Sequence, residues 1–206
     1  MPAPTHLLNP REAAYVANIP HRAVQQAIDR RQVARPFVVR TRNSRALTPA
    51  GALLVAADYR LGRSLSPAAR ARLREQIAAN ADPRRVPAVK DISVSIEPPE
   101  VVVSLGKLKG EVSGRLLALQ RALRMIVEDP DVQGGAPTFK GTRIVVRLVA
   151  AALERDVPAE ELFEDYGLTP EMLEAARIYA EVRPARGRPI RAIGGSAGRR
   201  VRRAAA

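Results

Sequence analysis

The chain contains no cysteine and only two histidines, His6 and His21. Without thiols there can be no disulfide bond, thiolate zinc site or cysteine nucleophile, and two imidazoles leave few ligands for another metal. Long apolar runs are also missing: no window approaches the roughly eighteen residues of a membrane span, and Met1 to Asn9 does not resemble a signal peptide. We therefore expect a cytoplasmic protein that contacts no membrane, is not an enzyme and needs no cofactor or metal.

Positive charge is abundant and unevenly distributed. The 206 residues are 46% apolar, enough for two small cores, and carry a net charge of +13. Residues 1–65 hold ten basic and three acidic residues (+7), and residues 184–206 hold seven arginines and no acid (+7). Residues 132–183 hold six basic and nine acidic residues (−3). Two basic ends around an acidic stretch predict two different anionic partners.

The sequence pattern predicts a mainly α protein with small β-hairpins, an α+β fold, in five segments. These are a helical module with a hairpin (1–65), a helix and linker (66–91), a hairpin and long helix (92–128), a three-helix domain (129–183) and a disordered basic tail (184–206).

The N-terminal segment combines short helices with a basic hairpin. Asn9 and Pro10 predict the start of a helix that runs to about Ala17, and Pro20 restarts a second helix. Strands are expected at 37–40 and 45–47, joined by a tight turn at 41–44, before a third helix that Thr48 and Pro49 begin and that runs to about Tyr59. Over about the first 62 residues this order resembles the winged helix-turn-helix of MerR-like and excisionase-like DNA-binding domains.

That resemblance implies a DNA-binding surface. We expect Arg22, Gln25 and Gln26, near the start of the second helix, to reach base edges in a major groove. Phosphate contacts are expected from Arg30, Arg31, Arg40, Arg42 and Arg45. The alternative interpretation is that these arginines form an ordinary solvated face.

The middle of the chain predicts a second helical region. Ser66 and Pro67 begin a helix, residues 82–89 form a linker, and alternating apolar residues between 92 and 103 predict a hairpin. A helix is expected from about Glu111 to Glu128. Its apolar seam consists of Val112, Leu116, Leu119, Leu123 and Ile126. This seam either forms a homodimer contact or covers the core of its own domain.

Residues 129–144, DPDVQGGAPTFKGTRI, are the most specific stretch. Gly134 and Gly135 predict a positive-φ turn, and Lys140 and Gly141 a second turn. Three helices follow, the last of which Thr169 and Pro170 begin and which runs to about Val182. The ordered block GG-x-P-x-x-x-GTRI and the helices behind it resemble a small bacterial family first catalogued as a domain of unknown function, whose members are regarded as VapB-like antitoxins of PIN-type toxins. The resemblance covers Asp129 to Val182 and implies a trihelical, helix-turn-helix-like domain.

An acidic run lies inside this region, formed by Glu160, Glu161, Glu164 and Asp165. It is the only support for the rival interpretation as a nuclease. Acidic residues in a first helical turn are stabilised by the helix dipole, so they need no catalytic explanation.

The tail after Arg183 cannot form its own core, so we expect it to order only on a partner. The antitoxin resemblance implies that one of its arginines enters the carboxylate-rich site of a toxin ribonuclease, and arginine binds carboxylates through two charge-assisted hydrogen bonds. The expected toxin-binding residues are Arg186, Arg188, Ile190, Arg191 and Ile193. In an alternative, the distal cluster of Arg199, Arg200, Arg202 and Arg203 forms a second phosphate-binding arm.

These features together predict the antitoxin of a type II toxin-antitoxin system. Such a protein would inhibit a VapC-like toxin, repress its own operon by binding operator DNA, and form a homodimer that assembles with the toxin. The alternative is a stand-alone MerR-like transcription regulator without a toxin.

Overall fold

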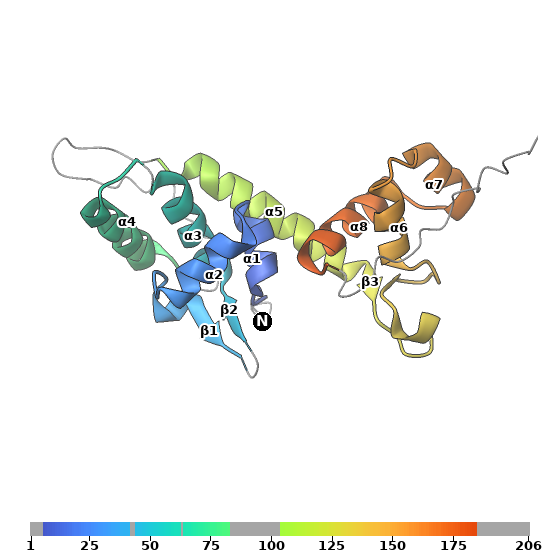
Figure 1. The fold of residues 1–206 in the computed structure, drawn as a ribbon, viewed down its shortest axis with the longest axis horizontal. Helices are drawn as coiled ribbons and strands as arrows, with labels where there is room; N and C mark the ends of the chain where they lie inside the picture. The colour runs from blue at the N-terminus through green and yellow to red at the C-terminus, as the bar shows by residue number, and fades with distance from the viewer. Residues whose placement is uncertain (1–5, 42–43, 63, 83–103, 185–206) are drawn as a thin grey trace, which may run out of the picture. The chain divides into compact units, whose positions relative to one another are not determined.

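The computed structural model describes residues 6–41, 44–62, 64–82 and 104–184. The chain forms two compact units, residues 1–121 and 122–206. In their described residues both units are mainly helical and contain one small antiparallel strand pair each, so the predicted mixture of helices and short hairpins is confirmed (Figure 1). Among the described residues, no helix combines the length and the apolar character that crossing a membrane requires. The finer division into five segments stays a prediction.

The first unit contains α1 (Pro10–Ala17), α2 (His21–Asp29), the 3-10 turn η1 (Arg35–Phe37), β1 (Val38–Arg40), β2 (Arg45–Leu47), α3 (Pro49–Leu61), α4 (Pro67–Asn80) and most of α5 (Gly106–Arg124).

Side-chain caps determine where several helices begin. The Asn9 side chain accepts hydrogen bonds from two backbone N–H groups of the first turn of α1, and the Glu12 carboxylate accepts the Asn9 N–H at 2.9 Å. Thr48, Ser66 and Thr169 cap α3, α4 and α8 (Pro170–Val182), and each is followed by proline. These caps satisfy N–H groups that have no partner within the helix. The predicted starts of these helices are confirmed.

The core of the first unit holds the base of the hairpin. Helix α1 packs against α2 and α3, and α3 packs against α4. Leu8 and Leu47 exchange two backbone hydrogen bonds of 2.8 Å, so β2 is joined to the segment before α1. Leu8, Phe37, Leu47 and Leu53 are all almost completely buried. The hairpin is therefore attached to the core at its base.

A buried carboxylate joins α3 to α4. Asp58 is 6% exposed and accepts hydrogen bonds from Arg70 at 2.8 Å and from Arg74 at 3.1 Å. Because a buried charge is costly without partners, these two guanidinium groups are what makes Asp58 tolerable on the inner face of α3.

Helix α5 differs from the prediction at both ends. It was expected from about Glu111 to Glu128 but spans Gly106–Arg124, and Ile126 lies in β3 (Ile126–Val127). Ile126 faces Phe139 across the antiparallel pair that β3 forms with β4 (Thr138–Phe139). The placement of Ile126 on the helical seam is therefore wrong. The hairpin expected between 92 and 103 lies outside the described residues.

The second unit follows the pattern expected from its glycines. Gly134, Gly135 and Gly141 have φ values of 63°, 81° and 79°, as the two predicted turns require. Three helices follow, α6 (Val146–Leu153), α7 (Ala159–Tyr166) and α8, and α6 packs against α8. A 3-10 turn, η2 (Gln133–Gly135), precedes β4.

Candidate functional site

Helix α2 presents a polar face to solvent. Asn18 ends α1 in the left-handed conformation at φ 51°, which asparagine tolerates well, and α2 begins after Pro20. One face of α2 buries Val24, Ala27 and Ile28. The predicted base-contacting residues and the basic residues that follow the helix are all exposed: Arg22, Gln25, Gln26, Arg30 and Arg31.

The β1–β2 hairpin places two arginines opposite each other. Its register pairs Arg40 with Arg45, immediately beside the turn. Thr41 closes this end of the hairpin, because its backbone N–H and its hydroxyl both donate to the Ser44 carbonyl, at 2.8 and 2.9 Å. Arg40 and Arg45 are therefore held at the same level of the hairpin, and both are exposed.

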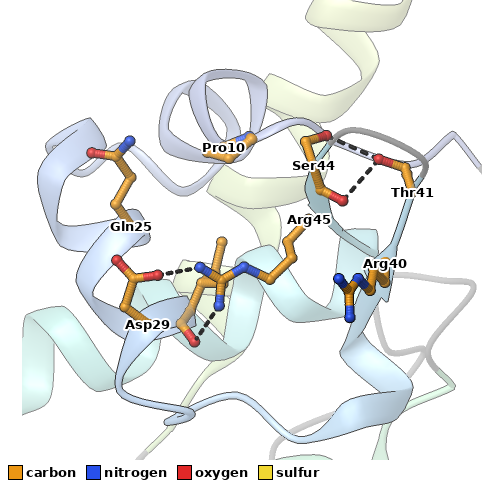
Figure 2. Close-up of a pocket in the computed structure, with 8 residues that line it drawn as sticks. Pro10, Gln25, Asp29, Arg40, Thr41, Ser44 and Arg45 are labelled. Atoms are coloured by element: carbon orange, nitrogen blue, oxygen red, sulfur yellow. Dashed lines mark hydrogen bonds and ion pairs between the residues drawn. The ribbon is translucent and has the colours of Figure 1, made fainter.

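A groove of about 710 Å³ separates the hairpin from α2. Figure 2 shows α2 contributing Gln25 and Asp29 to one side, and the hairpin contributing Arg40, Thr41, Ser44 and Arg45 to the other. Three predicted DNA-binding residues, Gln25, Arg40 and Arg45, thus line one hollow although Gln25 lies fifteen or more positions before the arginines in the sequence. Two of the three charged side chains that line the groove are arginines, so the groove suits an anion.

Arg45 spans the groove. Its guanidinium forms an ion pair with the Asp29 carboxylate and donates to the Ile28 carbonyl at 3.4 Å, as the dashed lines in Figure 2 show. About half of the Arg45 side chain and 61% of that of Asp29 stay exposed. This side chain therefore connects the hairpin to the last turn of α2, which adds a positioning role to the expected phosphate contact. Asp29 was not predicted as a site residue.

The other predicted DNA-binding arginines that the structure describes are available to a ligand, although of these only Arg40 lines the groove. Within the described part of the chain, Arg22, Arg30, Arg31 and Arg40 form no ion pair or hydrogen bond through their side chains. Arg42, also expected to bind phosphate, lies outside the described residues.

His21 adds no positive charge to this face near neutral pH. Partial burial, and then the charge of Arg11, lower the pKa of His21 below its usual 6.5. Its neutral form therefore dominates at pH 7, and the cationic character of the surface comes from the arginines.

The other predicted sites are only partly covered by the structure. Val112 and Leu119 of the predicted dimer seam are buried within the chain, whereas Leu116 and Leu123 are half-buried. Dimerisation through α5 stays a prediction. The expected toxin-binding residues, Arg186, Arg188, Ile190, Arg191 and Ile193, and the distal arginine cluster all lie outside the described residues.

The acidic run of α7 is exposed to solvent. In the described residues, no three side chains of histidine, cysteine, aspartate or glutamate come close enough together to bind a metal ion.

Comparison with known proteins covers both units. Residues 126–180, from β3 into α8, match the family model described as "Protein of unknown function (DUF433)". A Sinorhizobium fredii protein described as "Uncharacterized protein y4eO" is 30% identical over 192 residues, which cover 91% of this chain and 86% of that protein. No solved structure matches. The chain therefore belongs to the family of the y4eO protein and carries a DUF433 region in its second unit.

Proposed function

We propose that the chain is a DNA-binding antitoxin of the VapB type. Its first unit binds operator DNA of its own operon, and its C-terminal segment inhibits a PIN-type toxin ribonuclease. The observation that carries the DNA half is the groove between α2 and the hairpin, which brings Gln25, Arg40 and Arg45 together.

In this proposal the first unit acts as a winged helix-turn-helix. Helix α2 enters the major groove, where Arg22 and Gln25 can hydrogen-bond to base edges. The β1–β2 hairpin acts as the wing, and Arg40 binds a backbone phosphate beside the helix. The support is the arrangement of two short helices joined by a tight turn and followed by a basic hairpin at the same face.

The DNA half is tested by Arg40→Ala. The affinity of this variant for DNA from upstream of the gene is measured at salt concentrations between roughly 50 and 200 mM, a range in which salt screens phosphate contacts. The variant should bind more weakly, and its slope of log affinity against log salt should be smaller by about one. Arg155→Ala is the matched control, because it removes the same charge from an exposed arginine of the second unit. If the two variants bind alike, the groove is not the DNA site.

The antitoxin half of the proposal is supported by the composition of residues 184–206. This segment holds seven arginines and no acidic residue, and Ile190 and Ile193 lie among the arginines. Truncation of the chain after Val182 distinguishes the antitoxin proposal from the alternative of a stand-alone regulator. An antitoxin loses protection against a co-expressed toxin from the neighbouring gene, whereas a regulator with two DNA-binding ends shows weaker operator binding and unchanged growth. If the neighbouring product neither co-purifies with the full chain nor loses activity when saturated with it, the antitoxin proposal fails.

The nuclease alternative has its own test. Turnover of RNA with Mg²⁺ by the pure chain, lost on Glu161→Ala, would replace the antitoxin proposal by an enzymatic one.

A further inference from the structure

A second hollow in the molecule is apolar and lies within the second unit. It is a groove of about 340 Å³ between α6 and α7. Its walls include Val145, Leu148 and Ala152 on the α6 side and Leu162 and Tyr166, one turn apart, on α7. Gln133 and Arg143 also line it. Tyr166 is 40% exposed although its ring lines this groove. A ligand that covers it would therefore bury apolar surface that water now contacts.

Exposed carboxylates of α7 flank the groove residues in sequence, whereas among the described residues the one charged side chain that lines the groove itself is Arg143. Residues 122–183 hold twelve acidic and seven basic residues, a net charge of −5. On α7 the side chains beside Leu162 and Tyr166 in sequence, Glu161 and Asp165, are exposed carboxylates. The α7 side of the groove therefore suits a segment in which apolar residues alternate with positive charges.

We propose that residues 188–193 of the chain's own C-terminal segment, RPIRAI, bind this groove. Ile190 and Ile193 supply two apolar side chains, and Arg188 and Arg191 supply the charges that complement the α7 carboxylates. The same residues are the proposed toxin-binding segment, so the free protein holds its inhibitory segment against its own second unit until a toxin displaces it. This regulatory meaning rests on the proposed function, whereas the docking itself does not.

The chain is long enough for this contact. Helix α8 ends at Val182 and packs against α6, the helix that lines the groove (Figure 1). The ten residues from Pro184 to Ile193 span about 30 Å when extended, and a helix with its side chains is about 10 Å across. Tethering also gives the segment an effective concentration on the order of millimolar, so a weak interaction is enough to fill the groove.

The test uses the absence of cysteine. In the full chain, Ser196→Cys provides a single site for a nitroxide label beside the proposed anchor. The label should remove most of the amide NMR signal of groove residues such as Leu148, Ala152 and Tyr166. Ile190→Ser with Ile193→Ser should restore those signals, and the matched control Val201→Ser, an apolar residue outside 188–193, should not.

Two further samples settle the alternatives. Tyr166→Ala, at a part-exposed position, should also restore the remaining groove signals without unfolding the unit. A mixture of isotope-labelled chain without nitroxide and unlabelled chain with nitroxide reports contacts between molecules. Signal loss only in this mixture assigns the groove to a second copy and overturns the intrachain proposal, as does the absence of signal loss in every sample.

The failure of docking can be told apart from the failure of the proposed function. If the signal loss occurs but the chain neutralises no toxin, the docking stands and the antitoxin proposal falls. If toxin is neutralised without any signal loss, the docking is wrong.

Discussion

At the scale of single residues, Asp29 places one negative charge beside two positive ones. Its carboxylate pairs with Arg45, while Arg40 lines the same groove without an ion pair in the described structure. Because half of the Arg45 side chain is exposed, the pair contributes at most modestly to stability. Its main consequence is for ligand binding, since Asp29 competes with a phosphate for the Arg45 guanidinium.

Asp29→Asn should therefore strengthen binding to random-sequence DNA. Removing the carboxylate frees Arg45 for a phosphate, so the slope of log affinity against log salt should steepen by about one. Fluorescence anisotropy with labelled DNA at several salt concentrations measures both quantities. Asp131→Asn, an exposed aspartate of the second unit, makes the same change in net charge and should leave the slope unaltered. Equal slopes for the two variants would show that Arg45 does not contact DNA.

Tyr179 gives the second unit a pH-dependent contact. Its hydroxyl donates to the Glu128 carboxylate at 3.1 Å, and Arg147 lies 5.8 Å from the ring centre. Burial, and then the negative charge of Glu128, raise the pKa of Tyr179 above its usual 10. The folded chain therefore keeps this proton at a pH where the unfolded chain loses it. The resulting stabilisation is complete below about pH 10, the unfolded pKa, and is lost as pH rises toward the folded pKa.

Tyr179→Phe should cost about 1 kcal/mol at pH 8, because the hydrogen bond to Glu128 is lost. The difference in unfolding free energy between this variant and the unmodified chain should shrink as pH rises above about 10, because the tyrosine then ionises in the unfolded chain and this favours unfolding. Urea unfolding midpoints at pH 8 and at higher pH measure this. Tyr166→Phe, at a 40% exposed ring, is the comparison and should change little at either pH. A difference that stays constant with pH would contradict the assignment.

At the scale of elements, local chemistry determined what could be predicted. Asn9, Thr48 and Thr169 cap helices with their own side chains, so the helix starts were visible in the sequence. The end of α5 was not, because Ile126 leaves the helix to pair with Phe139, thirteen residues later. Apolar periodicity cannot report such a non-local hydrogen-bonded pair. The predicted start was also late, since α5 runs through Gly110 without interruption.

In the candidate site, too, the local features could be predicted from the sequence and the non-local contact could not. The exposed face of α2 follows from its periodicity, and the opposition of Arg40 and Arg45 follows from a tight hairpin turn. The contact of Arg45 with Asp29 requires the hairpin to fold back over the end of α2, which is a tertiary event. The sequence signals that could have suggested it are the aspartate at the last position of α2 and an arginine at the hairpin turn.

Two glycines should respond to alanine with opposite signs. Gly135 has φ 81°, a conformation that costs other residues roughly 1–2 kcal/mol, so Gly135→Ala should destabilise the chain by about that amount. Gly114 lies inside α5 with open space around the position of a Cβ. Gly114→Ala should stabilise by about 0.5–1 kcal/mol through helix propensity. Thermal unfolding of both variants gives the comparison, and a destabilising Gly114→Ala would mean that α5 contacts something at this position.

At the scale of the whole molecule, charge is concentrated at the two ends of the sequence. Residues 1–65 and 184–206 each carry +7, while residues 132–183 carry −3. A single anionic partner could neutralise both ends, as in the regulator alternative. Two partners, operator DNA and an acidic toxin, would each occupy one end and leave the other free.

The two-partner proposal predicts a ternary complex. Saturating toxin should not weaken operator binding, because the DNA contacts come from α2 and the hairpin while the toxin contacts come from residues beyond 184. Reciprocity requires that DNA also leaves toxin affinity unreduced. Anisotropy of labelled operator DNA, with and without toxin, measures the coupling, and the chain truncated after Val182 is the control to which toxin should not bind. Release of DNA by toxin, or a smaller salt slope in its presence, would place the tail arginines on the DNA phosphates, because toxin would then be removing contacts that the duplex had been using.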